Sequence, residues 1–154
     1  MDKRSLSNFI VACYILLIKV EKKFLLTIGK LGTFQFKPGF YLYVGSARKN
    51  LPARIHRHLS QNKKLYWHID YLLTQGKVTE IILIKENEEC KIAEVIRETS
   101  GVSSPIPGFG SSDCRCPTHL FYIQERNKWE IIPARLQNGG FTVKTSYVSP
   151  HNLD

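Results

Sequence analysis

The first third of the chain alternates between apolar runs and short polar breaks. The runs are rich in Ile, Leu, Phe and Tyr, which favour strands, and the breaks contain glycine, proline and charged residues. The expected strands cover residues 10–20, 24–28 and 39–44, with a short extended segment at 33–37. In the strand at 39–44, Tyr41 and Tyr43 alternate with apolar side chains, so both tyrosines fall on one face.

A helical pattern begins after residue 50. Asn50 is suited to capping a helix and Pro52 to its first turn, so a helix is expected from there to about residue 61. The following expected elements are a helix over residues 65–74, a strand over 78–84 and a helix over 88–99. Gly76 and Gly101 stand just beyond the two later helices and are typical of helix ends.

The last third is expected to close the sheet and then to loosen. Residues 103–117 form a loop rich in Gly, Ser and Pro, and a hairpin is expected from strands at 119–124 and 128–132. From Leu136 the composition turns polar, which is typical of a loosely held tail. We therefore expect one α/β domain over residues 1–135, followed by a polar C-terminal tail over residues 136–154.

The excess of basic residues over acidic ones indicates which kind of partner the domain binds. The chain has 154 residues, of which 43% are hydrophobic and 23% charged, as in one globular domain. Its 22 Lys and Arg residues exceed its 13 Asp and Glu residues, giving a formal charge of +9. Because the basic residues cluster around positions 48–64, we favour a nucleic acid partner over lysines that only solvate the surface.

Neither a membrane segment nor an export signal is expected. Residues 9–20 are apolar, but the run is too short to span a bilayer and lacks a small-residue cleavage site. The four cysteines do not indicate a disulfide framework in a chain of this length. We therefore expect a cytoplasmic protein in a reducing environment, with no membrane partner.

Residues 39–59, GFYLYVGSARKNLPARIHRHL, join an aromatic strand, a glycine turn and a basic helix. With Tyr43-Val44-Gly45 on the strand and Arg54 and His58 on the helix, the chain resembles the GIY-YIG nuclease superfamily. The segments YWHIDYLL (66–73) and PGFGSSDCRCPTHLFYI (107–123) resemble one branch of it. That branch consists of small archaeal and bacterial domains of unassigned function, sometimes fused to endonuclease III.

The resemblance covers roughly residues 10–132 and implies an α+β fold, with a small, mainly antiparallel central sheet flanked by helices. It also implies catalytic roles for two tyrosines, an arginine and a histidine. Tyr43 corresponds to the YIG tyrosine, and Tyr14, in Ala12-Cys13-Tyr14, to the tyrosine of the neighbouring strand. Arg54 would hold a phosphate oxygen, and His58 would act as a general acid or a second phosphate ligand.

The family's metal carboxylate lies on the helix after the third central strand, where Glu89 fits best and Glu94 is the alternative. A single carboxylate leaves Mg²⁺ or Mn²⁺ mostly hydrated. The resemblance therefore implies a metal-dependent DNA endonuclease that acts in DNA repair on branched, damaged or flapped DNA. Without the resemblance, both tyrosines would be ordinary strand aromatics and Glu89 a surface charge.

An alternative is a nucleic-acid-binding module that keeps the fold and has lost the chemistry. Arg54 would then join a phosphate-binding patch with Arg48, Lys49, Arg57, Lys63 and Lys64. The fused relatives further suggest a base-excision glycosylase as a partner, with the tail from Leu136 as the docking segment. His68, finally, would either line the active site or receive a hydrogen bond in the core.

Cys114, Cys116 and His119 form a separate candidate site. Two thiols and an imidazole within six residues could bind Zn²⁺. The spacing of the two cysteines is tighter than in zinc knuckles, and the fourth ligand would be Asp113, Cys13 or Cys90. The alternative is a loop that pins the edge of the sheet without a metal.

Overall fold

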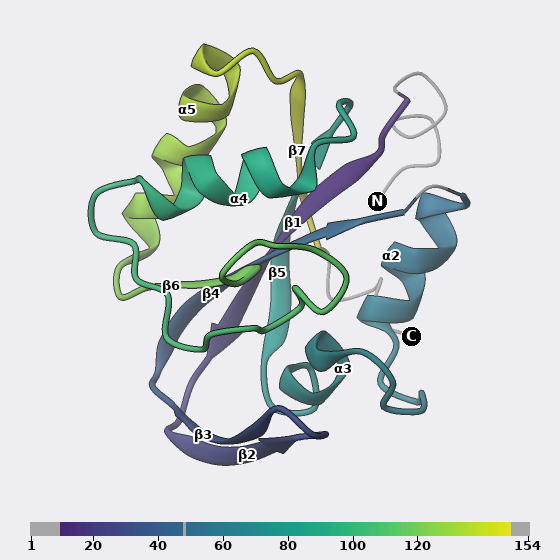
Figure 1. Ribbon diagram of the computed structural model, residues 1–154, viewed down its shortest axis with the longest axis vertical. Coiled ribbons are helices and arrows are strands. Elements are labelled where there is room, and N and C mark those ends of the chain that lie inside the picture. Colours follow the sequence, from purple (N-terminus) through teal and green to yellow (C-terminus); the bar gives the residue numbers. More distant parts are fainter. Residues whose placement is uncertain (1–9, 48, 149–154) are drawn as a thin grey trace.

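The computed structural model describes residues 10–47 and 49–148, and a five-stranded antiparallel sheet runs through its centre (Figure 1). The strand order is β6-β4-β1-β5-β7. The strands are β1 (Cys13–Val20), β4 (Gly39–Ser46), β5 (Lys77–Ile84), β6 (Leu120–Ile123) and β7 (Val143–Tyr147). Each neighbouring pair is antiparallel, so the expected α+β fold with an antiparallel sheet is confirmed.

A separate two-stranded sheet stands at one end of the main sheet (Figure 1). It consists of β2 (Phe24–Ile28) and β3 (Gly32–Phe36), where the sequence predicted a strand and a short extended segment. Its turn contains Gly29, at a φ of 46°, a backbone conformation that glycine adopts without strain. The rings of Phe24 and Phe36 stack at 5.0 Å between centroids, which joins the hairpin to the core.

Helices cover both faces of the sheet, because the central strands are apolar on both sides. Along β1, Tyr14, Leu16 and Ile18 face one core, and the intervening Cys13, Ile15 and Leu17 face the other. The first core lies under α2 (Leu51–Leu59) and α3 (His68–Leu72). The second lies under α4 (Glu89–Arg97), the 3₁₀ helix η1 (Arg126–Ile131) and α5 (Ile132–Asn138).

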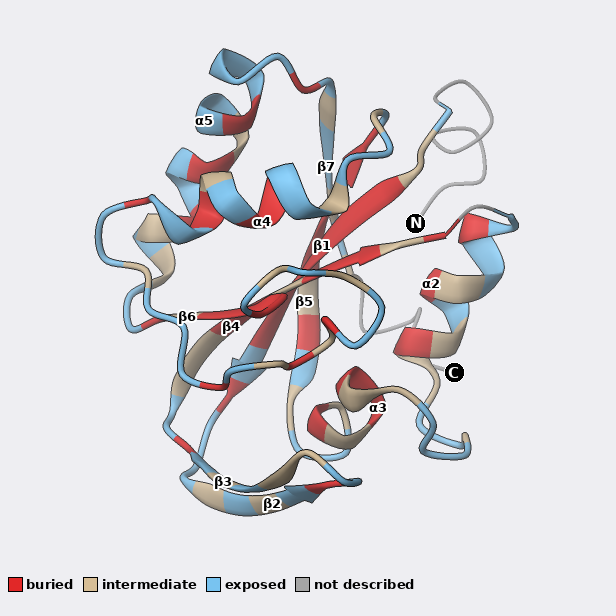
Figure 2. Cartoon of the chain, viewed as in Figure 1, coloured by how far each residue is buried: buried red, intermediate tan, exposed pale blue. Residues whose placement is uncertain are grey.

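Figure 2 shows the buried sheet between helices whose outer faces are exposed. These helices are short and have one apolar face each. Across residues 10–47 and 49–148, no helix combines the length and the apolar character that a bilayer-spanning segment requires.

The predicted closing hairpin is wrong in its second half. β6 pairs with β4 as an edge strand, but residues 128–132 belong to η1 and the start of α5. Trp129, Ile132 and Leu136 are all buried in the second core. Their spacing of three and four residues is helical, and Pro133 suits the first turn of α5.

The expected loose tail is also corrected. Leu136 is fully buried in α5, and Phe141 covers the end of the second core. β7 then pairs with β5 along the edge of the main sheet. An exposed edge strand carries polar residues, and this explains why the composition suggested a tail. The last residues of the expected tail, 149–154, lie outside the described residues.

Candidate functional site

Tyr14 and Tyr43 lie on neighbouring strands and on the same face of the sheet. In the β1–β4 register, Tyr14 is opposite Gly45 and Tyr43 is opposite Leu16. The two phenol rings are 6.5 Å apart between centroids. A Cβ at Gly45 would overlap the ring of Tyr14, so the glycine leaves the space that this ring fills. Tyr41 instead exchanges hydrogen bonds with the backbone of Lys37 and belongs to the scaffold.

Helix α2 brings Arg54 and His58 to the tyrosines. The helix is capped as predicted: the Asn50 side chain accepts a hydrogen bond from the Ala53 amide at 3.3 Å. Four residues apart, Arg54 and His58 share one face of the helix. Arg54 Nη1 donates to the Ser46 carbonyl at 2.7 Å, at the end of β4. His58 Nε2 lies 2.6 Å from the Tyr14 hydroxyl in a buried hydrogen bond.

The Tyr14–His58 pair is held without charge at neutral pH. Burial lowers the pKa of His58 to about 3, assisted by the positive charge of Lys63. Burial raises the pKa of Tyr14 well above its usual range, although the neighbouring Arg54 guanidinium acts in the opposite direction. Both effects follow from the cost of placing a charge in a weakly polar interior. Ionisation of Tyr14 therefore depends on cations at the site.

Tyr43 is half-buried beneath the loop that connects α4 to β6. Its ring packs edge-on against Phe109 at 6.1 Å and against His58 at 6.2 Å between centroids. Gly110, at a φ of 69°, passes so close that a Cβ there would lie 2.9 Å from Tyr43 Cε1. Burial raises the pKa of Tyr43, and the nearby Tyr14 and Glu89 add to this effect.

His68 helps to hold this loop. Its Nδ1 accepts a hydrogen bond from the Gly110 amide at 2.9 Å, and its ring packs against Phe109. Of the two roles considered for His68, the structure therefore has it receiving a hydrogen bond.

Glu89 reaches the same end of the sheet from the first turn of α4. Its side chain is 27% exposed, and Oε1 lies 3.6 Å from the Nδ1 of His119. Its negative charge contributes to the raised pKa of both Tyr14 and Tyr43, which indicates that the carboxylate lies near them. Glu94, the alternative, forms an exposed ion pair with Arg97 at 3.0 Å. The fold thus brings Glu89, rather than Glu94, to the tyrosines.

A buried ion pair that the sequence analysis did not single out supports the helix. Arg57 donates to both carboxylate oxygens of Asp70, at 2.7 and 2.9 Å, and Asp70 is fully buried. Burial alone would raise the pKa of Asp70. The hydrogen bonds from Arg57 and from the Trp67 and Tyr66 amides outweigh burial and lower that pKa. The only sequence signal was an aspartate in the first turn of α3.

Trp67 completes this support. The guanidinium carbons of Arg54 and Arg57 lie 4.4 and 4.3 Å from the centroid of its ring. A cation over an aromatic face is stabilised by the charge distribution of the ring. Arg54 is therefore positioned both by Trp67 and by the Ser46 carbonyl, which leaves other N–H groups of its guanidinium to bind an anion.

The expected phosphate-binding patch is distributed unevenly around α2. Lys49 and Lys64 are exposed, whereas Arg57 is engaged with Asp70 and Trp67. Lys63 donates from Nζ to the carbonyls of Arg57 and His58, at 3.0 and 3.1 Å, near the end of the helix. Arg48 lies outside the described residues.

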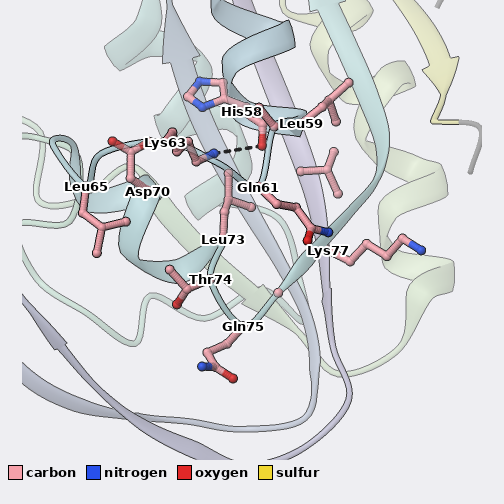
Figure 3. Close-up of a pocket in the computed structure, with 13 residues that line it drawn as sticks. His58, Leu59, Gln61, Lys63, Leu65, Asp70, Leu73, Thr74, Gln75 and Lys77 are labelled. Carbon is pink, nitrogen blue, oxygen red and sulfur yellow. Dashed lines mark hydrogen bonds between the residues drawn. The ribbon is translucent and has the colours of Figure 1, made fainter. Parts of the chain in front are cut away.

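A cavity of about 570 Å³ lies between the end of α2, α3 and the start of β5, and Figure 3 shows the residues that line it. Lys63 and Lys77 line it together with polar side chains such as Thr74 and Gln75. The Lys63 ammonium contacts the backbone of His58 there, as the dashed line in Figure 3 indicates.

Cys114, Cys116 and His119 come together with Cys90, one of the three residues considered as a fourth ligand. The sulfur and imidazole nitrogen atoms of these four residues all lie within 4.8 Å of one another. The Cys90 and Cys116 sulfurs are in disulfide contact, a pairing that the sequence did not lead us to expect. Cys13 instead is the first residue of β1 and is buried in the second core, with its sulfur 4.0 Å from Asn87 Oδ1. The cluster has the donors to hold a metal ion.

Comparison with known proteins gives one match. The model of a family described as "Domain of unknown function DUF123" matches residues 13–138, which include β1 through α5. This range contains both the tyrosine site and the cluster of three cysteines and one histidine. No curated protein and no solved structure matches the chain.

Proposed function

This chain belongs to the DUF123 domain family, and we propose that it is a metal-dependent DNA endonuclease related to the GIY-YIG nucleases. The observation that carries the proposal is the buried 2.6 Å hydrogen bond between Tyr14 and His58. Around it lie Tyr43, Arg54 and Glu89, from three different elements. Phosphodiester cleavage needs a proton acceptor, a phosphate ligand and a carboxylate for a metal, and these residue types supply them.

Arg54 is the phosphate ligand in this proposal. A guanidinium presents paired N–H groups that match two phosphate oxygens. Its cation would offset the charge that grows on the phosphate as the water oxygen attacks. Since Trp67 and the Ser46 carbonyl already fix its position, little ordering is required when the substrate binds.

Tyr14 and His58 form a proton path. As Tyr14 accepts a proton from the attacking water, its own hydroxyl proton passes to the neutral Nε2 of His58. The lowered pKa of His58 leaves this nitrogen unprotonated before the reaction but also makes it a weak base, so the negative charge of the bound phosphate would have to stabilise the protonated ring. Tyr43 stands beside the pair and would position the water.

Glu89 is the candidate ligand for Mg²⁺ or Mn²⁺. Its partly exposed carboxylate turns one oxygen towards His119, and an oxygen donor suits these hard cations. The ion would polarise the phosphate and stabilise the leaving oxygen. The basic residues Lys49 and Lys64 would hold the flanking DNA backbone.

A second candidate is a DNA-binding module that does not cleave. The burial of Tyr14, which is 1% exposed, favours it, because a substrate water has little direct access to the hydroxyl. Both candidates bind DNA through phosphate contacts, and the endonuclease alone introduces breaks. Base-excision glycosylases would be partners under either one.

The test is a panel of labelled DNAs, plain, branched, flapped and damaged, incubated with Mg²⁺ or Mn²⁺ and with a chelator. The endonuclease predicts breaks in at least one DNA that the chelator abolishes. Arg54→Ala and Glu89→Gln should each slow cleavage by about 100-fold or more. Glu94→Gln is the matched control and should cut at the wild-type rate, because Glu94 faces solvent beside Arg97. Equal cutting by all three variants would overturn the residue assignment.

A further inference from the structure

We propose that Cys90, Cys114, Cys116 and His119 bind one Zn²⁺ ion, independently of the nuclease proposal. Cys90 comes from the first turn of α4, Cys114 and Cys116 from the loop, and His119 from the residue before β6. The sequence separates Cys90 from the other three by more than twenty positions, yet the four ligand atoms lie within 4.8 Å of one another.

The distances suit a tetrahedral ion. Zinc binds sulfur at about 2.3 Å and imidazole nitrogen at about 2.0 Å, so a tetrahedron has sulfur–nitrogen edges of about 3.5 Å. Cys114 Sγ lies 3.4 Å from His119 Nε2. The other ligand atoms lie within 4.8 Å of one another, and the Cys90 and Cys116 sulfurs, now in disulfide contact, would separate by rotation of their side chains, neither of which is fully buried.

The donor set selects zinc over magnesium or manganese. Three thiolates and an imidazole are soft or intermediate ligands, whereas Mg²⁺ and Mn²⁺ prefer oxygen. Four protein ligands complete a tetrahedron and leave no position for water, which is typical of a structural zinc site. This site is therefore distinct in chemistry from the Glu89 carboxylate, although it lies next to it.

His119 provides an independent observation. Its ring is 1% exposed, and within residues 10–47 and 49–148 its buried Nδ1 has no hydrogen-bond partner. Zinc on Nε2 would place the proton on Nδ1, which faces Glu89 Oε1 at 3.6 Å. Metal-bound histidines usually donate their second ring N–H to a carboxylate or carbonyl. A small movement of Glu89 would complete this bond, so zinc would orient the carboxylate that the tyrosines adjoin.

The ion would also fix the tip of the loop between α4 and β6, whose base is already held by backbone hydrogen bonds. The Gly108 amide donates to the Pro117 carbonyl at 2.7 Å, and the His119 amide to the Phe109 carbonyl at 2.8 Å. Between these bonds, Cys114 and Cys116 lie near the tip of the loop, and the contact with Cys90 joins them to α4. A surface cavity of about 270 Å³ beside Cys90 and Cys116 offers an entry path.

The contact between Cys90 and Cys116 indicates the state that competes with zinc binding, a disulfide between these two residues. Their sulfurs can either form a disulfide with each other or bind zinc as thiolates. The two states are exclusive, so zinc content and thiol count distinguish them. With zinc, all four cysteines are reduced. With the disulfide, only Cys13 and Cys114 are free.

The experiment measures zinc by elemental analysis in the full chain, purified under reducing conditions and gel-filtered. One zinc per chain is expected. Cys90→Ser and Cys114→Ser should each lose most of it, while Cys13→Ser, a buried cysteine outside the cluster, should retain it. Cobalt in place of zinc should give the thiolate charge-transfer bands of a tetrahedral site.

A thiol titration of the unfolded wild-type protein keeps the proposal falsifiable if a variant fails to fold. Four reactive thiols with stoichiometric zinc support the site. Two reactive thiols, or four thiols with zinc far below one per chain after zinc is supplied, overturn it. The cleavage assay does not enter this test, so the zinc site and the nuclease proposal can fail separately.

Discussion

The Tyr14 hydroxyl and the His58 Nε2 lie 2.6 Å apart, and they join the first strand of the sheet to helix α2 across 44 positions. Both side chains are buried, so the bond is shielded from competing water. Removal of either partner would leave a polar atom without a partner in the interior. The pair therefore stabilises the packing of α2 on β1 and also forms the centre of the proposed active site.

Tyr14→Phe removes the hydroxyl and keeps the ring. We expect cleavage to fall by about 100-fold or more, because the proton path is broken. The free energy of unfolding should fall by about 1–3 kcal/mol, since His58 Nε2 loses its partner. Tyr41→Phe is the matched control, because this buried tyrosine bonds only to the Lys37 backbone and should lose stability without losing cleavage. Parallel losses of cleavage in both variants would assign Tyr14 a structural role alone.

Stability should fall as the pH is lowered through the range in which His58 is neutral in the fold and protonated in the unfolded chain. The pKa of His58 drops from 6.5 to about 3 on folding, so the unfolded state binds the extra proton between these values. The titratable and charged groups around His58 include Tyr14, Tyr43, Lys63, Asp70, Arg54 and Arg57. His58→Gln should reduce the slope of unfolding free energy against pH by up to about 1.4 kcal/mol per pH unit.

Urea unfolding from pH 7 to pH 4 measures this slope. The lowered pKa values of His68 and His119 act in the same direction, and comparison of the variant with the wild type cancels them. Equal slopes for the two proteins would show that His58 titrates normally and is not held neutral by burial.

Gly45→Ala should destabilise the site through the ring of Tyr14. A Cβ at this position would overlap that ring, which is held between β1, β4 and α2. We expect a loss of about 1–3 kcal/mol in the free energy of unfolding. Gly139→Ala, where the nearest atoms lie 3.5 Å from a Cβ, is the control and should change little. Thermal melts of both variants would reveal the difference, and similar melting temperatures would contradict the proposed fit.

The salt dependence of DNA binding should identify the phosphate contacts. Each contact adds about 0.9 to the slope of log K against log salt. The double variant Lys49→Ala, Lys64→Ala should therefore lower the slope by about 2. Lys128→Ala, on η1 at the opposite face of the sheet, should leave it unchanged. An unaltered slope in the double variant would show that Lys49 and Lys64 do not contact DNA phosphates and that DNA binds to a surface other than that around α2.

Much of the site could be anticipated from local pattern. Asn50 and Pro52 marked the start of α2, and Arg54 and His58 followed on one helical face. Alternation placed Tyr43 on its strand, whereas Tyr14 on the neighbouring strand was singled out by the resemblance to GIY-YIG nucleases and not by local pattern. The buried Asp70 could not be foreseen as the partner of Arg57, because thirteen residues and a turn separate them. Trp129 was assigned to a strand, since its helical spacing appears only when Leu136 is counted as core.

The sequence by itself determined the strands, the capped basic helix, the excess of positive charge and the residue types available for chemistry. These depend on the spacing of apolar positions and on backbone preferences within a few residues. The resemblance had already favoured Glu89, and the tertiary structure places it near the tyrosines while Glu94 pairs with Arg97. Only the tertiary structure decided that Cys90, among the candidate fourth ligands, joins Cys114, Cys116 and His119. These choices depend on how α4 and the following loop cross the sheet. Such long-range packing is set by the whole core, and spacing along the chain does not reveal it.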